Sequence, residues 1–187
     1  DFKRIGQTRD DAAGEAFDKA ARVLGLPYPG GVMMDKLASI GRKDAFPFTP
    51  ATVHNNEYDF SFSGLKTAVI NCVHNLNLRG QTLEEAVKAD IAASFTEALV
   101  RTIVTRVSLL LERTDAPALV LAGGVAANSH LRAAVSELCE RKGCALYLPP
   151  LSLCGDNAAM IAAQGYYEFQ AGSRAPLSQN AYATASV

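Results

Sequence analysis

The first part of the chain repeats apolar positions with the spacing of amphipathic helices. This spacing predicts a helix over residues 8–24, with Thr8 as its cap, Asp11 three residues later and Gly25 just beyond its end. A second helix is predicted over residues 32–40, after a turn that contains two prolines and two glycines.

The middle of the chain predicts a loop, a short strand and two more helices. Residues 41–59 are rich in proline, asparagine and polar side chains, as in a long surface loop. Aromatic and polar residues alternate over residues 58–62, which indicates a strand. Ser63 is a suitable cap for a helix to about residue 75. Thr82 begins a capping box before a helix that extends to about residue 111.

The last third changes to an α/β pattern. Residues 118–122 predict a buried strand, and Asn128 is a suitable cap for a helix to about residue 141. A second strand is predicted over residues 145–148, and this order favours parallel pairing of the two strands. Asp156 is expected to cap a last helix. We therefore predict an α/β fold with a large helical portion.

Composition narrows the class of protein. The 187 residues are 49% apolar and 20% charged, a balance that excludes disordered, collagen-like and disulfide-scaffold proteins. The formal net charge of −1 gives no electrostatic footprint for nucleic acid or for a membrane surface. No apolar run approaches the ~20 residues that a membrane span needs. A nucleic-acid partner must therefore be argued from other evidence.

The start of the chain and its cysteines indicate a compartment. The chain begins with Asp1 rather than Met, and no apolar segment follows, so we expect no secretory signal and a piece of a longer protein. The four cysteines include no Cys-x-x-Cys pair. We expect reduced thiols in the cytosol, with a zinc site or a disulfide as the less favoured alternative.

Two adjacent glycines follow the first predicted strand. Gly123 and Gly124 would let a ligand approach the backbone, and the start of the next helix suits a phosphate or a purine edge. The alternative is a glycine turn that only lets the strand and the helix pack closely.

Acidic residues gather near a second pair of glycines. Asp11, Glu15 and Asp18 share one face of the first predicted helix, and Asp35 follows the glycine turn. Carboxylates in this setting suit the hydroxyl groups of a ribose. The alternative is a solvated acidic face on which Asp18 pairs with Arg22.

Candidate metal ligands are few. Asp156 is either the structural cap of its helix or a single oxygen ligand to a metal. His54, His74 and His130 stand alone, so no complete zinc or iron site is predicted. Lys66 could reach a phosphate, although an ordinary first-turn lysine is the simpler interpretation.

Four motifs in order point to one family. They are DDAAGEAFDK with LGLPYPGG (residues 10–19 and 24–31), DFSFSGLKT (59–67), AGGVAAN (122–128) and CGDNAAMIA (154–162). Together they resemble the tRNA threonylcarbamoyladenosine transferases, the TsaD family, once described as O-sialoglycoprotein endopeptidases.

The resemblance implies an actin/Hsp70-like, ribonuclease H-like fold of two lobes with a ligand cleft between them. This chain would be the carboxy-terminal half. Residues 1–155 would form the second lobe with a helical subdomain, and residues 156–187 a terminal helix and tail that return toward the first lobe. The implied reaction transfers a threonylcarbamoyl group from threonylcarbamoyl adenylate to the exocyclic amine of the adenosine beside the tRNA anticodon.

The resemblance also implies site residues and partners. On the ribose side of the adenylate it implies Asp18, Gly31 and Asp35, and on the adenine side Gly123, Gly124 and Asn128. Asp156 would be one ligand of a single iron or zinc ion, and no catalytic residue is assigned. The implied partners are threonylcarbamoyl adenylate, tRNA and accessory proteins of the transfer complex, in the cytoplasm and without a membrane.

Two departures from the family pattern limit what the chain would do alone. The His-x-x-x-His metal motif and the Ser-Gly-Gly-His phosphate loop are absent. We therefore expect the isolated chain to bind metal weakly or not at all and to be inactive. A terminal helix without the first lobe would expose an apolar face and invite a homodimer, through Ala158, Ile161, Ala162 and Tyr166.

Other functions are weighed against this one. The alternative is a noncatalytic nucleotide- or partner-binding module of the same superfamily. A sugar-kinase or Hsp70-type ATPase shares the glycine turn but does not explain the first-helix motif. A peptidase has no support, because neither a protease nucleophile arrangement nor a His-Glu-x-x-His motif is present.

Overall fold

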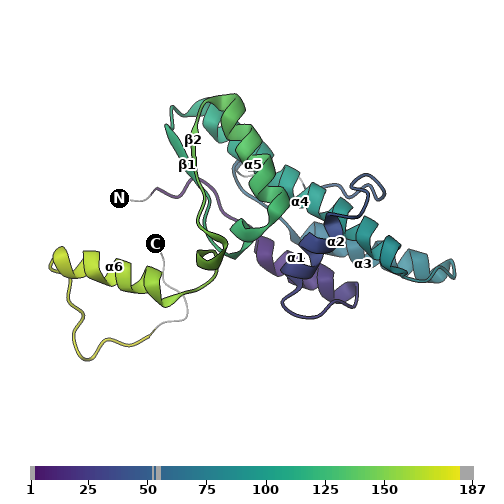
Figure 1. Cartoon of the computed structure of the whole chain (residues 1–187), viewed down its shortest axis with the longest axis horizontal. Coiled ribbons are helices and arrows are strands. Elements are labelled where there is room, and N and C mark those ends of the chain that lie inside the picture. The colour runs from purple at the N-terminus through teal and green to yellow at the C-terminus, as the bar shows by residue number, and fades with distance from the viewer. Residues whose placement is uncertain (1–2, 52, 54–55, 182–187) are drawn as a thin grey trace.

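The computed structural model describes residues 3–51, 53 and 56–181, and Figure 1 shows the order of its elements. Helices dominate this part of the chain. The α-helices are α1 (Ala13–Val23), α2 (Gly30–Ala38), α3 (Ser63–Leu78), α4 (Glu85–Arg113), α5 (Ser129–Lys142) and α6 (Ala158–Gln170). The strands are β1 (Ala118–Val120) and β2 (Ala145–Tyr147), and the short 3-10 turns are η1 (Gly124–Ala127) and η2 (Leu151–Leu153).

The main core surrounds the amino-terminal half of α4. Helices α1, α2 and α3 pack against it, and the Phe17 and Phe95 rings meet edge to face with centroids 5.4 Å apart. Leu65 and Leu99 are fully buried in the same cluster. Burying side chains of this size contributes about 1.5–3 kcal/mol each, so α4 is the element on which the first three helices depend.

A smaller core joins α4 to α5 and the sheet. Strands β1 and β2 pair in parallel with Leu119 opposite Leu146, and both leucines pack toward α5. This confirms the predicted strand–helix–strand unit and the α/β class. The predicted burial of the first strand is wrong at Val120, which is 68% exposed.

Close backbone approach explains Gly30. A Cβ at this position would lie 2.3 Å from the Cβ of Ala21, so only glycine lets α2 begin this close to α1. The predicted second helix therefore starts two residues earlier than its apolar spacing indicates.

The predicted start of the first helix is wrong, and so is the predicted strand over residues 58–62. Thr8 does not cap α1, because it forms an isolated parallel bridge with Phe60. The chain is therefore extended there, and α1 begins only after Ala12. The strand is reduced to that bridge, because the buried carboxylate of Asp59 accepts the Gln7 N–H (2.9 Å) in place of a strand carbonyl.

Two other predicted caps are also wrong. Helix α4 begins after Glu84 rather than at Thr82, because Glu84 is the extended residue that precedes the first turn. Helix α6 is capped by Asn157, whose Oδ1 accepts the Met160 N–H (3.0 Å), and not by Asp156. In contrast, Asn128 caps α5 as predicted, and Gly143 ends it in the left-handed conformation (φ 65°).

The start of α3 is stabilised by hydrogen bonds to Asp10, which lies in a distant segment of the chain. Ser63 is not the cap of α3 that the sequence predicts but its first residue, and Phe62 occupies the cap position. Instead, the Asp10 carboxylate accepts the N–H groups of Phe62 (2.8 Å) and Ser63 (3.1 Å) and the hydroxyls of Ser61 and Ser63. Partial burial raises the pKa of Asp10, but these hydrogen bonds outweigh it and hold the pKa at about 2.

Helix α6 lies apart from the other helices (Figure 1), and all its residues are exposed. Its large apolar side chains are between 46% and 68% exposed, namely Met160, Ile161, Tyr166, Tyr167 and Phe169. The division of the chain after residue 155 and a homodimer through this face stay predictions. No helix in the described part of the chain is long and apolar enough to cross a membrane.

The four cysteines form no disulfide in the structure, and their reduced state stays a prediction. Cys139 and Cys154 are buried, and desolvation raises the pKa of the Cys139 thiol. These thiols therefore behave as small apolar core residues.

The Asp10 contacts predict a pH-dependent contribution to stability. Since the folded-state pKa is about 2 and the ordinary value is 3.8, the contribution is present above pH 4 and is lost as the pH falls toward 2. We expect Asp10→Ala to cost about 1 kcal/mol at pH 7, because Asp10 is largely exposed and its interactions are screened. Urea unfolding at pH 7 and pH 3 measures this difference.

The exposed Asp44, replaced by alanine, is the control and should change little at either pH. An Asp10→Ala penalty of equal size at pH 7 and pH 3 would show that the charged carboxylate is not its source.

Candidate functional site

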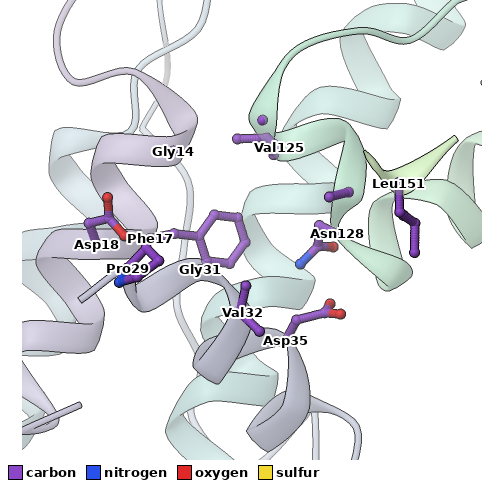
Figure 2. A pocket seen from close by; sticks show the side chains of 12 residues that line it. Gly14, Phe17, Asp18, Pro29, Gly31, Val32, Asp35, Val125, Asn128 and Leu151 are labelled. Atoms are coloured by element: carbon purple, nitrogen blue, oxygen red, sulfur yellow. The ribbon is translucent and has the colours of Figure 1, made fainter. Parts of the chain in front are cut away.

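A pocket of about 730 Å³ lies where α1, α2 and η1 meet (Figure 2). Its walls are mostly apolar, with three polar side chains among them. The lining residues are Gly14, Phe17, Asp18, Pro29, Gly31, Val32, Asp35, Gly124, Val125, Ala127, Asn128 and Leu151. An apolar cavity with a few convergent polar groups is the usual form of a small-molecule site.

The pocket brings together five of the seven site residues expected from the sequence. Asp18 comes from α1, Gly31 and Asp35 from α2, and Gly124 and Asn128 from the turn before α5. These segments are up to 110 residues apart, taking Asp18 and Asn128. Gly123 adjoins Gly124 without lining the pocket, and Asp156 lies outside it.

Asp18 links α1 to the start of α2. Its Oδ1 accepts the backbone N–H of Gly30 at 2.8 Å, and no hydrogen bond to its Oδ2 is found among the described residues. The alternative pairing of Asp18 with Arg22 is likewise not found in the described part of the chain. Asp18 therefore anchors a helix start with one oxygen and keeps the other available as an acceptor.

Asp35 makes the equivalent link from α2 to α5. Its Oδ1 accepts both the N–H and the hydroxyl of Ser129, each at 3.0 Å. The contact joins residues 94 positions apart and fixes α2 against the first turn of α5. Within the described residues, Oδ2 has no hydrogen-bond donor, so Asp35 also keeps one acceptor.

Asn128 completes the set from within its own helix. Its Oδ1 accepts the Leu131 N–H at 2.8 Å, and the residue is only 8% exposed. In Figure 2 the amide nitrogen of Asn128 points toward the side of the pocket on which Phe17 and Val32 lie. The same side chain thus caps α5 and presents a donor to the pocket.

The glycine pair is not explained by close packing. A Cβ at Gly123 or at Gly124 would meet no heavy atom within 4 Å. Gly123 has a φ of 90°, which favours glycine, and Gly124 leaves open space at the pocket wall. Of the two interpretations from sequence, the structure therefore disfavours strand–helix packing at this turn.

The residues that the sequence did not identify are the apolar ones. Phe17, Val32, Val125 and Leu151 line the pocket, and flat apolar walls suit a planar ring system. For two of these residues the sequence does contain a signal. Phe17 precedes Asp18, and Val32 lies three residues before Asp35 on one helical face. Leu151 follows a proline pair in a loop, where no periodicity could identify it.

Lys66 is held away from any phosphate role in this structure. Its Nζ lies 3.3 Å from Asp11 Oδ2, and Lys19 Nζ lies 2.8 Å from Asp11 Oδ1. The hydrogen bond from Lys19, followed by that from Lys66, lowers the pKa of Asp11. The simpler interpretation of Lys66, as an ordinary first-turn lysine, agrees with this geometry.

Asp156 is exposed between Gly155 and the α6 cap. The described residues contain no group of three His, Cys, Asp or Glu side chains that could hold a metal ion. His74 and His130 lie on different helices, and His54 lies outside the described residues. Asp156 as a metal ligand stays a prediction.

Comparison with known proteins gives a consistent match. The family model for tRNA N6-adenosine threonylcarbamoyltransferase (TsaD) matches residues 1–163. The protein of that name from Moorella thermoacetica is 51% identical over 177 residues, which cover 95% of this chain and 51% of the relative.

Two further relatives carry the same name. The Desulfitobacterium hafniense protein is 49% identical over 180 residues, which cover 96% of this chain and 52% of the relative. The Bacillus subtilis protein is 48% identical over 180 residues, which cover 96% and 51%. The chain spans about half the length of these curated relatives.

The Asp35 contacts predict a loss of stability without any ligand. We expect Asp35→Ala to lower the free energy of unfolding by about 1–2 kcal/mol, because Ser129 loses the acceptor for two donors. Asp35→Asn keeps an oxygen acceptor and should retain most of the stability. Urea unfolding of both variants is the measurement.

Lys36, the exposed neighbour of Asp35 on α2, provides the matched control as Lys36→Ala. If Asp35→Ala unfolds at the same urea concentration as this control, the link between α2 and α5 contributes nothing measurable.

Proposed function

The chain belongs to the TsaD family of tRNA N6-adenosine threonylcarbamoyltransferases, and we propose that it is the adenylate-binding half of such an enzyme. The observation that carries the proposal is the convergence of Asp18, Asp35 and Asn128 on one apolar pocket. Each was expected from the family motifs to contact the adenylate. We also propose the family's two-lobe actin/Hsp70-like arrangement, of which residues 1–155 would be the second lobe.

The pocket offers complementary chemistry to the ribose and to the adenine of an adenylate. The unengaged Oδ2 atoms of Asp18 and Asp35 are acceptors, and the two hydroxyls of a ribose are donors. Gly31 lies between them on α2 and gives the sugar room, since a Cβ there would meet nothing within 4 Å.

On the opposite wall, the Asn128 amide nitrogen is a donor that suits a ring nitrogen of adenine. Val125 and Leu151 provide apolar surface for the face of the base, and Gly124 leaves the backbone open to its edge. The proposed assignment is therefore ribose toward α1 and α2, and adenine toward η1.

The proposed reaction is an acyl transfer. The exocyclic amine of the tRNA adenosine attacks the carbonyl carbon of the threonylcarbamoyl group, the new bond is C–N, and the C–O bond to the phosphate breaks. AMP leaves with the electron pair, and the attacking amine loses a proton. The residues of this chain would hold the AMP portion so that the carbonyl faces the amine.

We propose one iron or zinc ion for the intact protein, with Asp156 as one ligand. Such an ion would polarise the carbamoyl and phosphate oxygens when bound. The described residues contain no group of three side chains that could complete a site, so further ligands would come from outside this part of the chain. Nothing in the proposed adenylate binding depends on the ion.

The partners follow from the same proposal. They are threonylcarbamoyl adenylate, tRNA and accessory proteins, and the place of action is the cytoplasm. The net charge of −1 gives no electrostatic footprint for nucleic acid. We therefore assign part of the tRNA binding to the accessory proteins.

Titration of AMP into the chain tests the adenine side. Asn128→Asp keeps the Oδ1 that caps α5 but replaces the donor amide with an anionic oxygen. We expect AMP affinity to fall about tenfold or more with little change in stability, since a lost hydrogen bond is worth about 1.4 kcal/mol. Asn128→Leu should lose both the binding and the cap.

Isothermal calorimetry gives the affinities, and urea unfolding gives the stabilities. Equal AMP affinity of the wild-type chain and Asn128→Asp would refute the adenine-side assignment. Absence of AMP binding to the folded wild-type chain would refute the proposal that this half alone forms the adenylate site.

We expect the 187-residue chain alone to transfer no threonylcarbamoyl group to tRNA, because the described residues contain no group of three side chains that could hold a metal ion. The assay supplies threonylcarbamoyl adenylate, tRNA, the accessory proteins and iron or zinc, with the full-length Bacillus subtilis relative as the positive control. Measurable transfer by the chain would overturn this expectation. AMP binding without transfer is also what the noncatalytic alternative predicts, and activity on adding the other half of the relative would exclude that alternative.

A further inference from the structure

Arg132 joins two loops that border the pocket. It lies one helical turn after Asn128 on α5 and is half-buried. Its Nη1 donates to the carbonyl of Ala126 at 2.9 Å, and its Nη2 donates to the carbonyl of Pro149 at 3.1 Å. Nη1 also lies 3.8 Å from the Sγ of Cys154.

No carboxylate pairs with Arg132 among the described residues, so backbone carbonyls are its main partners. Removing a guanidinium from water costs free energy unless its N–H donors are hydrogen-bonded. Here backbone carbonyls provide those hydrogen bonds in place of the usual carboxylate. A packing role would need only the apolar stem of the side chain. The two carbonyls instead require the planar fork of donors that arginine has and lysine lacks.

The two carbonyls belong to the two loops that form one wall of the pocket. Ala126 lies in η1, between the lining residues Val125 and Ala127, and Pro149 lies two residues before the lining residue Leu151. Glycines at 123, 124 and 155 make these loops intrinsically flexible. A single rigid group that binds both loops therefore sets the separation of Val125 and Leu151.

We infer that Arg132 is a positioning residue that couples the glycine turn to the segment Pro149 to Asp156 and so sets the width of the adenine side of the pocket. The coupling of the loops stands on the contacts alone, whereas its effect on nucleotide affinity rests on the proposed function. Through Cys154, the same contacts also determine where the chain enters the segment that carries Asp156.

Hydrogen exchange of the chain without nucleotide tests the coupling directly. In Arg132→Met, we expect amides of both loops, 124–128 and 151–154, to exchange about tenfold faster or more, while amides of α1 and of the buried part of α4 stay unchanged. Arg132→Lys should show the same pattern in weaker form, because one ammonium cannot reach both carbonyls. The matched control is Arg141→Met, since Arg141 lies on the same helix and pairs only with Glu137 in the described structure.

AMP titration of the same variants is the second measurement. We expect AMP affinity to fall about tenfold or more in Arg132→Met and to stay unchanged in Arg141→Met, under conditions in which both are fully folded. Faster exchange in only one loop or in neither, or faster exchange throughout the chain, would overturn the inference. If wild-type AMP binding is absent, the proposed function fails, while the exchange data still decide whether Arg132 couples the loops. Unchanged AMP affinity in Arg132→Met with both loops loosened would overturn the assigned effect on the pocket.

Discussion

The pocket depends on one constraint, which is that the first N–H groups of a packed helix need acceptors. Here those acceptors are side chains that also border the ligand space. Asp18 serves the start of α2, and Asp35 and Asn128 serve the start of α5. Because each cap fixes one atom of a carboxylate or amide, the remaining atom has a fixed direction before any ligand arrives, and little rotational entropy is left to lose on binding.

This arrangement also ties stability to the site. A side chain that were only a ligand-binding group could be replaced at no cost to folding, whereas Asp35 holds two helices together through Ser129. Conservative variants that keep the capping oxygen are therefore the ones that separate the two roles. Asn128→Asp is such a variant, because aspartate caps a helix as well as asparagine does.

Sequence patterns predicted some local features and missed contacts between distant segments. The Asn128 cap was predictable, because it depends on residues within one turn. The Asp10 cap of α3 was not, since its partners lie more than 50 positions away. The same distance explains the error at Thr8, whose bridge to Phe60 overrides a sound local capping pattern. The family motifs identified the polar residues of the pocket. The apolar contribution of Leu151 could be identified only from the folded structure.

The pocket lies between the two hydrophobic cores, so a ligand in it can contact residues next to both. Asp18 and Gly31 lie on α1 and α2, whose apolar residues form the cluster around the start of α4, whereas Asn128 caps α5, whose apolar residues form the cluster with the sheet. Val125 packs against both clusters and lines the pocket. A molecule that contacts both walls adds to the connections between the two cores. These include α4 itself and the hydrogen bonds from Ser129 to Asp35. The binding energy of the molecule is then shared with the packing of the two cores, so occupancy of the pocket stabilises their relative position as well as the site.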